Sequence, residues 1–200
     1  MGARIRPLGL RERKKIQTRE TIQREAYRLF DENGYANTTV EQIADAAEVS
    51  PSTFFRYFPS KELVLMADDL DRVTIDALAR QPADLSPLQA FRCAFDITMK
   101  TVSEDNWELE RTRQRLVFSI PELKAAQFDA YHRIIRLLAE AECQRSGREG
   151  DDFEVRVFFG VLAGALMAVI DRTPGAIDQL YRALDFIEAG MPLGAPDSDS

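Results

Sequence analysis

Hydrophobic residues recur every three or four positions along most of this 200-residue chain, and no segment shows the strict alternation of a half-buried strand. Capping residues, glycines and prolines divide this pattern into separate helices. Gly34 marks the end of the first helix, and Ser86-Pro87 marks the start of a later one. The pattern predicts an all-α fold with helices over about residues 11–33, 39–47, 50–58, 61–80, 86–102, 105–118, 121–147, 149–173 and 176–189.

Two of these helices are short and follow each other closely in the first third of the chain. Thr39, with Gln42 three residues later, has the pattern of a capping box, and Ser50 followed by Pro51 marks the next helix start. The second helix presents hydroxyl groups and Arg56 opposite an apolar side. Such a pair is typical of a helix-turn-helix, which places its second helix in the major groove of DNA. An ordinary helical hairpin is the alternative that the pattern alone leaves open.

The predicted DNA contacts divide by chemistry. The hydroxyls of Ser50, Ser52 and Thr53 and the guanidinium of Arg56 can read base edges in the groove, whereas Thr39, Tyr57 and Lys61 hold the DNA backbone. The predicted DNA-binding residues are Thr39, Ser50, Pro51, Ser52, Thr53, Phe55, Arg56, Tyr57 and Lys61.

The net charge of −7 would by itself argue against a nucleic-acid partner, but its distribution reverses that argument. Residues 1–28 hold nine arginines and lysines against three glutamates, whereas residues 61–200 hold 16 basic and 25 acidic residues. A basic end on an acidic body is the asymmetry expected when one end contacts phosphates. A solvated basic tail without a partner is the alternative, and the neighbouring helix-turn-helix disfavours it.

The segment Val49–Leu63 reads Val-Ser-Pro-Ser-Thr-Phe-Phe-Arg-Tyr-Phe-Pro-Ser-Lys-Glu-Leu and resembles the signature of TetR-family transcriptional regulators. The segment Ala26–Val40 is similar to the first helix of that family and the residues that follow it. The resemblance covers about residues 14–65. It implies a homodimer in which each subunit has a three-helix DNA-binding head and a larger ligand-binding and dimerising body.

We therefore expect a helix-turn-helix domain with a basic arm over residues 1–60 and a helical body over residues 61–190. The glycine- and proline-containing residues 191–200 are expected to form a disordered tail. By the same resemblance, the protein is expected to be a repressor that binds an inverted-repeat operator in double-stranded DNA and is released by a small hydrophobic effector.

Four positions depart from the family pattern. Glu48 occupies the turn where the family usually has glycine, and a non-glycine residue in a left-handed conformation there costs about 1 kcal/mol. Pro51-Ser52 replaces the usual Lys-Gly, and Phe55 replaces the usual tyrosine. These changes leave DNA binding as such intact, but no known operator sequence can be transferred to this protein.

The two C-terminal helices carry more apolar surface than a body of this size is expected to bury alone. Gly160 and Gly164, four positions apart, leave a strip where another helix can approach closely. Two such helices that meet their symmetry mates would form a four-helix bundle across a two-fold axis. We therefore expect a homodimer, with a purely intramolecular core as the alternative.

Aromatic residues in the middle helices could line a cavity, although an aromatic stripe at helical spacing is more often plain core. Arg111 and Arg115 share a helical face and could hold the acidic group of a long-chain effector, or simply pair with glutamates on the surface. The segment Glu110–Leu123 is also similar to acyl-CoA-responsive members of the family. The predicted ligand-binding residues are Phe91, Phe95, Met99, Trp107, Arg111, Arg115, Phe118, Phe128 and Tyr131.

An enzyme is the rival class, but His132 is the sole histidine, and no metal triad, phosphate-binding glycine loop or nucleophile elbow is present. We expect neither enzymatic activity nor a metal or cofactor. A helical adaptor would explain the apolar C-terminal helices but not the helix-turn-helix. The apolar run Val157–Ile170 contains fourteen residues, too few to span a bilayer, so we expect a cytoplasmic protein without a membrane partner.

Overall fold

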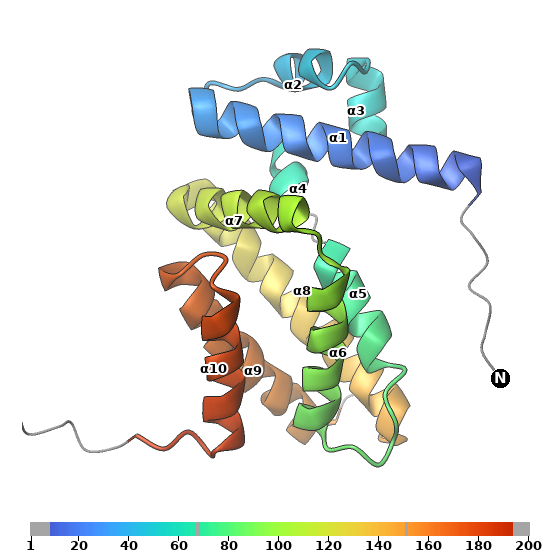
Figure 1. The fold of residues 1–200 in the computed structure, drawn as a ribbon, viewed down its shortest axis with the longest axis vertical. Coiled ribbons are helices and arrows are strands. Elements are labelled where there is room, and N and C mark those ends of the chain that lie inside the picture. Colours follow the sequence, from blue (N-terminus) through green and yellow to red (C-terminus); the bar gives the residue numbers. More distant parts are fainter. Residues whose placement is uncertain (1–8, 67–68, 151, 194–200) are drawn as a thin grey trace, which may run out of the picture. The chain divides into compact units, whose positions relative to one another are not determined.

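The computed structural model describes residues 9–66, 69–150 and 152–193. Every regular element among these residues is a helix, which confirms the predicted all-α fold (Figure 1). The helices are α1 (Leu10–Asn33), α2 (Val40–Ala46), α3 (Pro51–Tyr57), α4 (Lys61–Met66), α5 (Asp69–Leu78), α6 (Pro87–Thr101), α7 (Glu104–Ser119), α8 (Pro121–Ser146), α9 (Phe153–Arg172) and α10 (Ile177–Glu188).

The helices form two compact units, Met1–Ala67 and Asp68–Ser200. The first unit packs α2, α3 and α4 around the long helix α1, with a core that includes Ile22, Phe30, Ile43 and Phe54. These side chains bury the apolar faces of helices too short to be stable alone.

Helix α4 belongs to the first unit, because Val64 and Leu65 are fully buried and the Tyr27 hydroxyl donates a hydrogen bond to the Val64 carbonyl at 3.1 Å. The first unit therefore extends past the boundary at residue 60 that the sequence suggested. The sequence also predicted one helix over residues 61–80, where the structure describes α4 and α5 as separate helices.

In the second unit, α5, α6, α8, α9 and α10 form a bundle, and α7 crosses its end (Figure 1). Helix α5 packs against α6 and α8, while α9 packs against α8 and α10. The core is rich in aromatic and leucine side chains, among them Phe91, Phe159, Leu162 and Leu184. A cavity lies among these helices.

Local sequence signals explain most helix ends. Ser86 forms a capping box with Gln89 at the start of α6, with Pro87 in the first turn. Gly147, in a left-handed conformation, ends α8. The predicted disordered tail is coil over residues 191–193, and its remaining residues, 194–200, lie outside the described part of the chain.

Among the described residues, one helix is long and apolar enough to cross a membrane by length and composition, namely α9 with its 20 residues. Its most apolar stretch has a mean hydropathy of 2.0, and 17% of that stretch is buried. The helix is thus longer than the fourteen-residue run on which the sequence argument relied. Its low burial means that the described residues of this chain leave much of its apolar surface uncovered.

Candidate nucleic-acid interface and ligand cavity

The α2–turn–α3 segment begins each helix with a side-chain cap. The Thr39 hydroxyl accepts the amide N–H of Gln42 at 3.2 Å, and the Gln42 side chain accepts the amide N–H of Thr39 at 2.8 Å. The Ser50 hydroxyl accepts the amide N–H of Thr53 at 3.1 Å, and Pro51 occupies the first turn of α3. Each cap satisfies helix N–H groups that would otherwise lack partners. Both predicted helix starts are therefore confirmed.

Glu48 lies in the turn between the two helices with a φ of 54°, the left-handed conformation expected from its position. The turn is held by backbone hydrogen bonds from Glu48 N–H to Asp45 O at 3.1 Å and from Val49 N–H to Ala44 O at 2.9 Å. These contacts keep the strained residue in place, at a cost of about 1 kcal/mol relative to glycine.

Helix α3 is anchored by Phe54, which is fully buried, and presents Ser52, Phe55 and Arg56 on its outer side. Phe55 is 49% exposed, unusually high for a phenylalanine. Thr39, Ser50 and Pro51 are also exposed, while Thr53, Tyr57 and Lys61 are half-buried. The Ser50 hydroxyl lies 2.9 Å from that of Ser52 and 3.0 Å from that of Thr53. Ser50 is thus engaged as a cap, which leaves Ser52, Phe55 and Arg56 as the accessible face.

Lys61 has partners within its own unit that the sequence did not indicate. Its ammonium donates hydrogen bonds to the carbonyls of Tyr35 at 2.8 Å and Thr38 at 3.1 Å, and lies 4.1 Å from the centre of the Tyr35 ring. Two of its three donors therefore hold the α1–α2 connection. A phosphate contact by Lys61 would have to use the third.

Basic side chains line part of α1. Arg11, Arg13 and Lys14 are exposed, whereas Arg28 forms ion pairs with Glu25 at 3.0 Å and Glu32 at 2.7 Å. The hydrogen bonds that its guanidinium donates to these carboxylates raise the pKa of Arg28. Arg4 and Arg6, which the predicted basic arm includes, lie outside the described residues.

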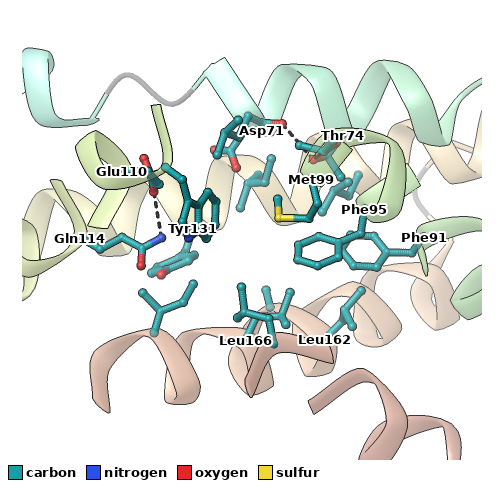
Figure 2. Close-up of a pocket in the computed structure, with 18 residues that line it drawn as sticks. Asp71, Thr74, Phe91, Phe95, Met99, Glu110, Gln114, Tyr131, Leu162 and Leu166 are labelled. Atoms are coloured by element: carbon teal, nitrogen blue, oxygen red, sulfur yellow. Dashed lines mark hydrogen bonds between the residues drawn. The ribbon is translucent and has the colours of Figure 1, made fainter. Parts of the chain in front are cut away.

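The cavity in the second unit has a volume of about 140 Å³ and is lined by residues from six helices. Figure 2 shows Glu110, Gln114 and Tyr131 at one end, Phe91 and Phe95 at the other, and Asp71 with Thr74 on the wall between them. The remaining lining residues are Leu70, Thr98, Met99, Trp107, Ile134, Leu138, Leu162, Ala163, Leu166, Ile170 and Leu180.

A polar network links one end of the cavity to the turn between α9 and α10. Glu110 is buried and forms an ion pair with Arg113, with 2.6 Å between the carboxylate oxygen and the guanidinium nitrogen. The same carboxylate accepts a hydrogen bond from the side-chain amide of Gln114 at 2.8 Å. The Gln114 carbonyl oxygen in turn accepts the Gly175 N–H at 2.9 Å, and the Trp107 indole donates to the Gly175 carbonyl at 3.2 Å. Gly175 has a φ of +75°, and a Cβ there would meet the Arg111 side chain, so this position requires glycine.

The structure brings five of the predicted ligand-binding residues together in the cavity, namely Phe91, Phe95, Met99, Trp107 and Tyr131. The other four do not line it. Phe118 and Phe128 line a separate groove beside α9. Arg111 and Arg115 are exposed, and Arg111 pairs with Glu108 while it lines a surface groove together with Met99 and Trp107.

Sequence reasoning missed the contribution of α5 and the polar lining of the cavity. Thr74 and Thr98 are both buried, with their hydroxyls 2.9 Å apart, so they join α5 to α6 inside the cavity wall. A detectable signal was present, because each threonine interrupts the apolar face of its helix. Among the described residues, no cluster of three histidine, cysteine, aspartate or glutamate side chains could hold a metal ion.

An apolar strip runs along the outside of α9. Phe153 is 67% exposed, and Val157 and Val161 follow at four-residue spacing with 46% and 43% of their surface exposed. Gly164 continues the strip, and a Cβ added there would meet nothing within 4 Å in the same subunit.

Two family models match the chain. Residues 22–67 match the model described as bacterial regulatory proteins, tetR family, and residues 85–192 match the model described as MftR C-terminal domain. The chain is 39% identical over 161 residues to the HTH-type transcriptional regulator TcmR of Streptomyces glaucescens, covering 76% of this chain and 71% of that protein. It is 26% identical over 158 residues to the HTH-type transcriptional repressor KstR of Rhodococcus jostii, covering 77% and 73%.

Two solved structures share the fold. SmeT, the repressor of the Stenotrophomonas maltophilia multidrug efflux pump SmeDEF, aligns with a TM-score of 0.52 at 20% identity, over 89% of this chain and 97% of SmeT. Thermus thermophilus FadR, a repressor solved in complex with lauroyl-CoA, aligns with a TM-score of 0.50 at 24% identity, over 91% and 99%. At these identities the likeness concerns the fold alone.

Proposed function

Because the chain belongs to the TetR family of bacterial transcriptional regulators, it is a DNA-binding regulator of transcription, and we propose that it is a repressor released from its operator by a small hydrophobic effector. This family is one of regulators and not of enzymes, and its members are soluble DNA-binding proteins that act as dimers. We further propose that this protein acts in the cytoplasm.

One observation supports the DNA contacts most directly: α3 is capped by Ser50, anchored by buried Phe54 and presents Ser52, Phe55 and Arg56 on its accessible side. A recognition helix needs this combination of a fixed inner face and a polar outer face. In this proposal Arg56 and Ser52 read base edges and Phe55 packs on a sugar or a thymine methyl group. The capped N-termini and the exposed basic residues of α1 contact phosphates.

The proposed dimer uses α9 and α10. The exposed strip of Phe153, Val157 and Val161, continued by Gly164, is apolar surface that a second copy of the chain would cover. Because α9 has the length and hydropathy of a membrane span, this proposal gives an alternative explanation for its apolar surface, and no membrane partner is required. A two-fold dimer matches an operator with two half-sites one helical turn or a multiple apart.

The cavity is the proposed effector site. It lies within the body, most of its lining is apolar, and residues of all six helices from α5 to α10 line it. An effector can weaken DNA binding only if it prefers a body conformation that the DNA-bound dimer does not adopt. Helix α5 follows the DNA-binding unit in the chain, so its Thr74 contact with Thr98 is the connection on which we expect an effector to act.

Selection from random duplex DNA, followed by fluorescence anisotropy at several salt concentrations, tests the proposal. We expect an enriched inverted repeat, an affinity that falls steeply with salt, and a loss of about 1–3 kcal/mol with relaxed specificity for Arg56→Ala. Arg80→Ala, an exposed arginine in the second unit, provides the charge-matched control. Absence of any enriched duplex, or equal binding by wild type and Arg56→Ala, would contradict the proposed interface.

A further inference from the structure

The cavity described above has a distinct electrostatic character. Of the described residues that line it, the charged ones are Asp71 and Glu110, and both are acidic. Glu110 is already paired with Arg113, which is itself buried. Within the part of the chain that the structure describes, no arginine or lysine lines the cavity to receive an acidic group. An anionic ligand would therefore leave water without gaining a cationic partner, and burial of a charge without such a partner is strongly unfavourable.

The hydrogen-bond inventory points in the same direction. The Trp107 indole N–H is used by the Gly175 carbonyl, and the Gln114 amide is used by Glu110 and Gly175. Thr74 and Thr98 have one hydroxyl hydrogen each, but they take part in three contacts: with Leu70 O at 2.9 Å, with Ala94 O at 3.0 Å and with each other at 2.9 Å. Their remaining capacity is to accept. On this wall the two threonine hydroxyls and the carboxylate of Asp71 are acceptors, beside the Tyr131 hydroxyl, which can donate or accept.

The volume limits the size of the ligand. A cavity of about 140 Å³ is close to the roughly 150 Å³ that holds a single benzene ring, and lies below the roughly 300–1,000 Å³ typical of sites for drug-sized ligands. The aromatic end formed by Phe91 and Phe95 suits a ring (Figure 2).

We propose that this cavity selects a compact ring-bearing molecule that carries a hydroxyl or amine as hydrogen-bond donor and no acidic group, with Asp71 accepting from the donor. The inference rests on the proposed effector role of the cavity and replaces a long-chain acid, expected from the sequence, by a neutral or cationic aromatic ligand. The ring occupies the Phe91 and Phe95 end, and the donor group turns toward the carboxylate wall.

Three ligands with one ring and one long-chain acid test the proposal on the full-length protein without DNA. Benzyl alcohol, benzylamine, benzoate and dodecanoate are titrated into the millimolar range while the fluorescence of Trp107, the sole tryptophan, and the melting temperature are followed. We expect benzyl alcohol and benzylamine to bind, benzoate to bind at least about tenfold more weakly, and dodecanoate not to bind in the cavity. Benzoate or dodecanoate binding as tightly as benzyl alcohol, or no binding by either donor ligand, would overturn the proposal.

Variants of α5 test the role of Asp71. Asp71→Asn should reduce the affinity for benzylamine about tenfold and narrow the difference between benzylamine and benzoate. Asp76→Asn removes the same charge from an exposed position of the same helix and should change neither. Equal effects of the two variants would overturn the role of Asp71, and the wild-type ligand series decides ligand class even if Asp71→Asn folds poorly. Because these measurements contain no DNA, a failure of the operator proposal would appear separately, in the anisotropy experiment.

Discussion

Replacement of Lys61 by methionine separates two roles that the residue could have. The structure engages the ammonium with the carbonyls of Tyr35 and Thr38 and with the Tyr35 ring, all within the first unit. Methionine keeps an unbranched apolar stem but removes the charge and the donors. We therefore expect Lys61→Met to destabilise the DNA-binding unit.

The magnitude follows from the contacts. Hydrogen bonds from a charged group contribute about 1.5–3 kcal/mol each, and a surface cation–π contact about 0.5–1 kcal/mol. Because Lys61 is half-buried and water can reach the freed carbonyls, about half of that sum is a reasonable expectation, or about 2–3 kcal/mol. For a unit of this size, such a loss lowers the melting temperature by roughly 10 °C or more.

Two optical signals report this loss separately. Circular dichroism follows helices of both units, whereas the fluorescence of Trp107 follows the body alone. Lys61→Met should melt earlier by circular dichroism and leave the Trp107 transition unchanged. The control Lys14→Met removes an exposed charge from α1 and should leave both transitions in place. Unchanged melting of Lys61→Met, together with a salt slope of DNA binding flatter by about one unit, would refute the structural role and favour a phosphate contact.

Three further predictions follow from individual contacts. Glu48→Gly should stabilise the DNA-binding unit by up to about 1 kcal/mol in thermal unfolding, because glycine adopts the left-handed turn without strain; an equal gain with Glu48→Ala, which keeps the strain, would point to charge instead. Gly164→Phe should convert the proposed dimer to monomer in sedimentation while leaving the helix content intact, because a Cβ at this position meets nothing within 4 Å in its own chain and the ring would stand in the proposed interface; a stable dimer would place the interface elsewhere. Burial and the hydrogen bond to Asp96 raise the pKa of Tyr181 to about 12 from 10.0. This contact therefore stabilises the body below pH 10, and the stabilisation is lost as the pH rises from 10 through 12. In urea unfolding, Tyr181→Phe should show a smaller loss of stability over this pH range than the wild type.

Features that depend on neighbouring residues in the chain were predictable. The caps at Thr39, Ser50 and Ser86 follow from local hydrogen bonding, which the sequence displays directly, whereas the strained turn at Glu48 was expected from the resemblance to the TetR family. Helical periodicity likewise indicated which faces of α1, α6 and α9 are apolar. The fold class follows from these local rules.

Features that depend on contacts between distant segments were not predictable. Lys61 binds carbonyl groups 23 and 26 positions earlier in the chain, and Trp107 and Gln114 bind Gly175 more than 60 positions later. Neither set of contacts produces a periodic pattern in the sequence. The same reason explains the cavity. Its aromatic end was visible as a stripe on α6, but the inward placement of Asp71 depends on how α5 packs against α6 and α8.

The hydrogen bonds that Trp107 and Gln114 form with Gly175 link ligand binding in the cavity to subunit association. Trp107 and Gln114 line the cavity and between them bind both the carbonyl and the N–H of Gly175, which lies in the turn between α9 and α10. If those two helices form the dimer interface, a ligand that moves either side chain also changes the free energy of subunit association. Thermodynamic linkage then requires that association change the free energy of ligand binding by the same amount. The apparent effector affinity would then depend on the concentration of the protein itself. A cell would thereby set the sensitivity of this regulator through the amount of regulator that it makes.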